Sequence, residues 1–168
     1  MKKKTILFVE HDEQDWIGTL DRLDNFKIDM VFNIKSILGH LDLCISEIRK
    51  IDLDEFEAVF LDVYFWHDKE EFASNSAKDE AYQLLDILRS RAPWLPVIAY
   101  TQHLDGKLTY EISRRQYDAI VPKQMIKRES SFSLQMFNHI VENAVKCRQK
   151  IANASDFIIS SDKKKEYS

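Results

Sequence analysis

The sequence predicts an α/β fold in which five parallel strands alternate with five helices to form a doubly wound sheet. Two observations support this prediction. Short apolar runs of strand length recur along the chain and alternate with longer segments whose apolar residues keep helical spacing. Several of these runs also end on a reactive polar residue, as expected where the carboxyl ends of parallel strands line one edge of a sheet.

Each expected strand is a short and nearly continuous apolar segment, of the kind that is buried on both faces of a sheet. The expected strands are residues 4–9, 28–32, 57–62, 97–101 and 118–122. Pro93 and Pro96 bracket a turn into the fourth strand. These positions divide the chain evenly enough for a helix to fit between successive strands.

The expected helices begin at capping residues or follow loops. Asp12 is a candidate N-cap for a first helix that continues to about Leu23, and Asn33 for a second that continues to Ile48. The remaining helices are expected around residues 81–88, 107–115 and 130–151. We therefore expect a domain over residues 1–151 and a charged C-terminal tail over residues 152–168.

Composition narrows the class of protein. With 168 residues, 45% hydrophobic and 31% charged, the chain is typical of a single globular domain. Its net charge of −4 predicts no general attraction to nucleic acid or to an anionic membrane, and no apolar run reaches the roughly 18 residues of a membrane helix. Cys44 and Cys147 have no disulfide or metal spacing, so we expect reduced thiols and a cytoplasmic location. The three glycines are not clustered, which excludes nucleotide-binding loops of the Walker or dinucleotide type.

Four strand ends carry the residues of chemical interest. The first run ends on Glu10, His11 and Asp12. The later runs end on Asp62, Thr101 and Lys123. A carboxylate, a hydroxyl, an ammonium and an acidic corner gathered at one sheet edge can accept and hold a phosphoryl group.

In these landmarks the sequence resembles the receiver domain of bacterial two-component response regulators. The matching segments are ILFVEHD, AVFLD ending on Asp62, VIAYT ending on Thr101 and DAIVPK ending on Lys123. Thr101 and Lys123 lie 22 positions apart (123 − 101), which is the usual spacing of that family. The resemblance covers about residues 3–151 and implies a flavodoxin-like three-layer sandwich.

The resemblance also implies a function. Asp62 would accept a phosphoryl group, Glu10 and Asp12 would help Asp62 to bind Mg²⁺, Lys123 would bind the phosphoryl group and Thr101 would hydrogen-bond to it. The implied partners are a sensor histidine kinase or phosphotransfer protein and a downstream protein, so that the chain would be a stand-alone signalling receiver and not an enzyme.

The sequence departs from the family pattern at several of these positions. His11 stands where the family has an acidic metal ligand, and imidazole suits transition metals better than Mg²⁺, so Mg²⁺ binding should be weakened. Gln102 replaces a small residue, Ile120 an aromatic switch residue, and Gln124 a proline. The segment 63–78 is longer than a typical βα loop and carries several aromatic residues, which suits either a binding loop or a cluster folded back on the next helix.

These departures leave alternatives open. The chain could be a pseudo-receiver that uses the same fold as a phosphorylation-independent interaction module. His11, His67 and His103 could form a transition-metal site with Asp62. A phosphohydrolase of the haloacid-dehalogenase type would need a second Asp two residues after Asp62, where Tyr64 stands.

Overall fold

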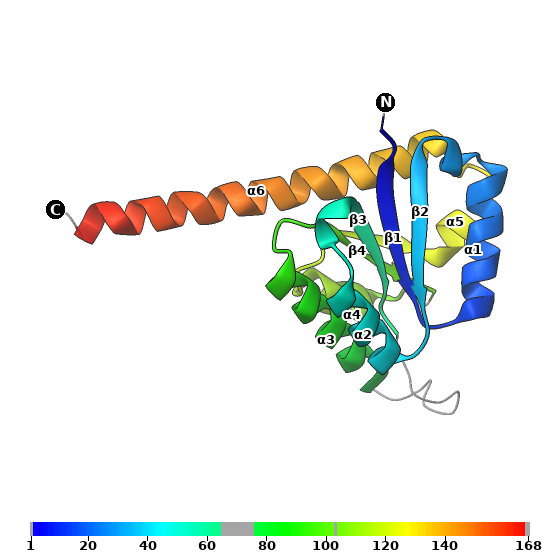
Figure 1. Cartoon of the computed structure of the whole chain (residues 1–168), viewed down its shortest axis with the longest axis horizontal. Coiled ribbons are helices and arrows are strands. Elements are labelled where there is room, and N and C mark those ends of the chain that lie inside the picture. Colours follow the sequence, from blue (N-terminus) through cyan, green and yellow to red (C-terminus); the bar gives the residue numbers. More distant parts are fainter. Residues whose placement is uncertain (1, 65–75, 103, 167–168) are drawn as a thin grey trace.

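A single parallel sheet forms the centre of the molecule. The computed structural model describes residues 2–64, 76–102 and 104–166, with side chains for residues 2–64, 81–102 and 104–154. The strand order is β2-β1-β3-β4-β5, and all neighbouring strands run parallel (Figure 1). The strands are β1 (Lys4–Glu10), β2 (Phe32–Leu38), β3 (Phe56–Asp62), β4 (Val97–Thr101) and β5 (Ala119–Pro122). This confirms the predicted doubly wound α/β fold.

Helices cover both faces of the sheet, which gives the predicted three layers (Figure 1). On β1, Ile6 and Phe8 pack with the buried residues of α1 and α6, whereas Leu7 and Val9 pack with those of α2 and α3. The helices are α1 (Glu13–Asn25), α2 (Leu41–Lys50), α3 (Ser76–Arg91), α4 (Gly106–Ser113), α5 (Lys123–Lys127) and α6 (Leu134–Glu166), with two short 3₁₀ helices, η1 (Ile28–Met30) and η2 (Leu53–Glu55).

The region between α1 and α2 differs from the prediction. Residues 28–30 form η1 instead of a strand, and the strand follows at Phe32–Leu38, where the sequence suggests a helix capped by Asn33. β2 lies at the edge of the sheet, so several of its side chains are exposed, and the spacing of Ile34, Ile37 and Leu38 imitates a helix. Gly39, with φ of 141°, then turns the chain into α2.

The C-terminal part of the chain also differs from the prediction. A short helix, α5, begins at Lys123, directly after β5. The last helix does not end at Ile151 but continues to Glu166 (Figure 1), because residues 152–166 contain no glycine or proline to stop it. The division into a domain and a C-terminal tail stays a prediction. No helix within the described ranges combines the length and apolar character needed to cross a membrane.

A buried ionic cluster fixes α3 and α6 at the amino end of β5. The carboxylate of Asp118 accepts hydrogen bonds from Arg89 Nη2 at 2.8 Å and from Arg148 Nε at 3.0 Å. It also accepts one from the backbone N–H of Val97 at 2.9 Å. Both guanidinium groups donate to the carbonyl of Gln116 as well. Because Asp118 joins two helices to two strands, it holds α6 against the domain just before that helix extends past it.

Candidate functional site

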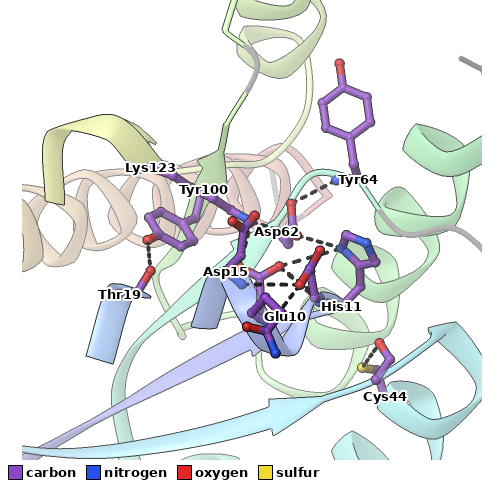
Figure 2. A network of polar contacts seen from close by, with 12 residues as sticks. Glu10, His11, Asp15, Thr19, Cys44, Asp62, Tyr64, Tyr100 and Lys123 are labelled. Atoms are coloured by element: carbon purple, nitrogen blue, oxygen red, sulfur yellow. Dashed lines mark hydrogen bonds and ion pairs between the residues drawn. The ribbon is translucent and has the colours of Figure 1, made fainter. Parts of the chain in front are cut away.

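Three of the predicted site residues meet at the carboxyl edge of the sheet. β1 ends on Glu10 and β3 on Asp62, and Lys123 follows β5 as the first residue of α5. Their side chains are nearly inaccessible, with exposures of 1%, 2% and 2% respectively. Figure 2 shows the three side chains pointing toward one another. The topology therefore assembles two carboxylates and one ammonium in a buried group.

Asp62 is held through both of its carboxylate oxygens. Oδ2 accepts from Lys123 Nζ at 3.0 Å and lies 3.1 Å from Nδ1 of His11. Oδ1 accepts a hydrogen bond from the backbone N–H of Tyr64 at 3.1 Å. An ionised carboxylate only accepts, so Nδ1 of His11 must carry the proton in this contact. Asp62 thus has two cationic neighbours at one oxygen and a single backbone donor at the other.

Lys123 binds three carboxylates. Its Nζ lies 2.6 Å from Glu10 Oε2, 3.0 Å from Asp62 Oδ2 and 3.3 Å from Asp15 Oδ2. The contact to Glu10 is an ion pair without the alignment of a hydrogen bond. Asp15 belongs to α1 and also pairs with Lys127 at 2.7 Å. This second ion pair joins α5 to α1 and so fixes the backbone position of Lys123.

Glu10 and His11 are locked together at the end of β1. Glu10 Oε1 accepts from the backbone N–H of His11 at 3.1 Å and from that of Asp12 at 3.3 Å. The His11 ring, with 9% of its side chain exposed, lies with Nδ1 3.6 Å from the same Oε1. Nδ1 therefore stands between the carboxylates of Glu10 and Asp62 (Figure 2).

Burial and charge together set the protonation of the two carboxyl groups. Burial raises the pKa of Glu10 to about 8, and the neighbouring Asp62 carboxylate adds to this effect. Burial acts in the same sense on Asp62, but the Lys123 ammonium and the hydrogen bonds from Glu10 and His11 outweigh it. They hold the pKa of Asp62 well below its usual range. Asp62 is therefore the more acidic of the two carboxyl groups.

The two cationic neighbours of Asp62 retain their protons. Burial opposes the charge of His11, but the hydrogen bonds to Asp62 and Glu10 and the charges of these groups raise the pKa of His11 to about 9. Burial likewise opposes the charge of Lys123, and the carboxylates of Asp62 and Glu10 nevertheless raise the pKa of Lys123. At neutral pH both groups are positive, so Asp62 lies between two charged donors.

The other predicted site residues lie around this group. Asp12 caps α1, its carboxylate accepting from the backbone N–H groups of Gln14 and Asp15 at 2.8 and 3.2 Å, so the structure does not bring it into the cluster. Thr101 ends β4 and is fully buried, beside Pro122 of β5 in the sheet register. Among the residues proposed to flank the pocket, Gln102 and Ile120 are half-buried. His67, His103 and most of the aromatic segment 63–78 lie outside the described residues.

The residues at this edge do not fit Mg²⁺. Glu10, His11 and Asp62 each offer a ligand atom, and these atoms lie within 4.8 Å of one another, which is close enough for a metal ion. Mg²⁺ prefers oxygen ligands in octahedral geometry and keeps several waters, whereas one donor here is an imidazole nitrogen. The oxygen nearest to that nitrogen is already shared with Lys123. As a donor set the group is closer to a transition-metal site than to a magnesium site.

Two residues of the site, Asp15 and Lys127, are not predicted by the sequence. In the sequence, Asp15 is only an acidic residue in the first turn of an expected helix, and Lys127 belongs to a segment with no expected role. Their pairing depends on α5 folding against α1, where Arg22 donates to the carbonyls of Ile126 and Glu129 at 2.9 and 2.7 Å. The only signal in the sequence is that Lys123 and Lys127 lie four residues apart, the spacing of one helical face.

Several solved structures have a fold similar to that of this chain. The structure resembles a CheY-like response-regulator receiver domain from Methanospirillum hungatei, with a TM-score of 0.57 and 13% identity over 89% of this chain and 98% of the other. It resembles a signal receiver domain of a two-component histidine kinase from Clostridium thermocellum, with a TM-score of 0.58 and 15% identity over 86% and 99%. A receiver protein from Sinorhizobium medicae gives a TM-score of 0.55 and 16% identity over 88% and 98%.

Comparisons based on sequence find no such likeness. No family model matches the chain, and no curated protein matches it. The chain therefore has the flavodoxin-like fold of CheY-like receiver domains, at 13–16% sequence identity to the three structures above.

Proposed function

We propose that this receiver-fold protein is a signalling switch in which Asp62 accepts a phosphoryl group and the altered state is read by a partner protein. The observation that supports the proposal is the contact of 3.0 Å between Lys123 Nζ and Asp62 Oδ2. The ammonium keeps Asp62 ionised, hence nucleophilic, and stands ready to neutralise an incoming phosphoryl oxygen.

The remaining groups of the site suit this role. Glu10 and Asp15 hold the Lys123 ammonium in place from two further directions. Thr101, at the end of the neighbouring strand β4, supplies a hydroxyl near the same edge of the sheet. Phosphoryl transfer depends mainly on positioning and charge neutralisation, which these groups provide without a separate catalytic domain. The proposed role is therefore one of accepting and displaying a phosphoryl group.

The proposed partners are a histidine kinase or phosphotransfer protein as the donor and a downstream protein as the reader. The face formed by α4, β5 and α6 is the proposed surface for the reader. On α4 the Tyr110 side chain is 62% exposed, and just before this helix Leu104 is 38% exposed. Exposed aromatic side chains are enriched in protein interfaces, which makes α4 a reasonable centre for this surface.

The test is phosphorylation by a small donor. The protein is incubated with acetyl phosphate and Mg²⁺, and intact-mass spectrometry follows the addition of one phosphoryl group. We expect an acid-stable, alkali-labile adduct in the wild type and none in Asp62→Asn. The matched control is Asp105→Asn, which changes an exposed aspartate at the N-cap of α4. An adduct that persists in Asp62→Asn would refute the assignment.

A second function, that of a phosphorylation-independent interaction module, is favoured by a different observation. Asp62 is only 2% exposed, and its Oδ2 is already shared by Lys123 and His11. In such a pseudo-receiver the same cluster would serve as a buried structural ion network. Absence of any adduct with acetyl phosphate, together with no response to the phosphoryl mimic beryllofluoride, would favour this second function.

A further inference from the structure

His11 stands where a cation would be needed if Asp62 accepted a phosphoryl group. Its Nδ1 is 3.1 Å from Asp62 Oδ2 and 3.6 Å from Glu10 Oε1. A distance of 3.1 Å between a ring nitrogen and a carboxylate oxygen is that of a hydrogen bond, so the Nδ1–H of His11 donates directly to Asp62.

We propose that His11 replaces the divalent cation in this site, so that Asp62 accepts a phosphoryl group without Mg²⁺. This inference rests on the proposed function, because it concerns the requirements of the same reaction. It starts from the disagreement between the donor set and Mg²⁺: the imidazole makes the site poorer for that ion and at the same time places an N–H donor between the carboxyl groups of Asp62 and Glu10.

The two carboxylate oxygens of Asp62 then have different roles. Oδ2 accepts from the side chains of Lys123 and His11, while Oδ1 accepts from the backbone N–H of Tyr64. Oδ1, the oxygen other than the one held by Lys123 and His11, is therefore the nucleophile in this proposal. With acetyl phosphate, a bond forms between Oδ1 and phosphorus as the bond from phosphorus to the acetyl oxygen breaks, and acetate leaves with that electron pair. No proton needs to move, and no oxidant or reductant is required.

The positive charges in the site suit this step. The transferred phosphoryl group carries its charge on oxygens that must be neutralised as it moves. Lys123 supplies one positive charge, and a metal ion would normally supply the rest. Here the Nδ1–H of His11, which lies between the carboxyl groups of Glu10 and Asp62, is a second donor to the same oxygen of Asp62. Because both donors belong to the chain, they are in place before the phosphoryl donor arrives.

The test compares phosphorylation with excess EDTA and with Mg²⁺. For the wild type we expect the rates to agree within about twofold, because the cationic groups belong to the chain. His11→Gln should slow the reaction in EDTA by about 10²-fold, the effect of removing one charge-stabilising donor. His11→Asp, which supplies an acidic ligand instead, should react only with Mg²⁺. The control His139→Asp makes the same substitution at an exposed histidine on α6, and it should behave like the wild type.

Direct metal binding gives a second readout that does not depend on phosphorylation. Isothermal titration with Mg²⁺ should show no binding to the wild type or His139→Asp and measurable binding to His11→Asp. Unfolding curves verify that each variant is folded. A wild type that is modified only when Mg²⁺ is present, or that binds Mg²⁺ as tightly as His11→Asp, overturns the role of His11 but leaves the proposed function intact. No modification of the wild type under either condition contradicts the proposed function, and the titration still decides whether His11 has replaced the metal.

Discussion

His11 should make the stability of the protein depend on pH in a defined direction. The folded state raises the pKa of His11 from 6.5 to about 9, so the folded protein binds this proton more tightly than the unfolded chain does. The resulting stabilisation is fully present below pH 6.5 and is lost as the pH rises through 9. Replacing His11 with Gln removes this contribution and keeps a side chain that can still donate to Asp62.

The size of the effect follows from the pKa values. One pKa unit corresponds to about 1.4 kcal/mol, so the rise from 6.5 to about 9 amounts to about 3 kcal/mol. His11 is only 9% exposed, so solvent screens its contacts little. The raised pKa of Glu10, about 8 against the ordinary 4.5, acts in the same direction and its contribution is lost as the pH rises through 8.

The assay is urea unfolding followed by tryptophan fluorescence at about pH 5.5 and about pH 9.5, where His11 is fully charged and largely neutral. Trp16, buried beside Phe8, reports on the half of the core next to the site. We expect the difference in unfolding free energy between the wild type and His11→Gln to shrink by about 3 kcal/mol from the lower to the higher pH. A difference that stays constant across this range would show that His11 does not bridge the carboxylates as the structure has it.

Two further predictions concern stability away from the site. Asp118→Asn leaves two buried guanidinium groups without their carboxylate and should lower the free energy of unfolding by about 3–5 kcal/mol in a urea titration, whereas Glu55→Gln, at an exposed ion pair, should change it by less than about 1 kcal/mol. Equal losses in the two variants would contradict this account. Gly39→Ala should lower the melting temperature, because φ is 141° there and a Cβ would lie 2.5 Å from Leu43 Cδ2; an unchanged melting temperature would show that the turn can relax.

The sequence predicts the central strands well and the edge strand poorly. The segments that form β3 and β4 are continuous and apolar because helices cover both faces of the sheet there. Such short apolar runs predict a buried strand. β2 has a single strand neighbour and exposes Asn33, Lys35 and Ser36, so its apolar residues no longer mark a buried strand. Hydrophobic periodicity fails where burial is partial, because it is burial that produces the pattern.

The same distinction applies to the site. Asp62 and Lys123 could be predicted together because each follows a buried strand, and the topology of a parallel sheet brings such residues to one edge. Asp15 could not, because its role depends on how α5 rests on α1. The sequence marks His11 as a departure at a metal position, but the direct contact between its ring and Asp62 is visible only in three dimensions.

Asp118 and Asp62 lie at opposite ends of the sheet and differ in the partners that hold them. Both are buried, and each lies between two cationic side chains. Asp118 accepts hydrogen bonds from Arg89, Arg148 and the backbone N–H of Val97. Asp62 likewise accepts from Lys123, His11 and the backbone N–H of Tyr64. The cations of Asp118 are two guanidinium groups that also bind the carbonyl of Gln116, whereas Asp62 shares the ammonium of Lys123 with Glu10 and Asp15. If Asp62 accepts a phosphoryl group as proposed, this shared ammonium, and not burial or charge, must distinguish it from Asp118.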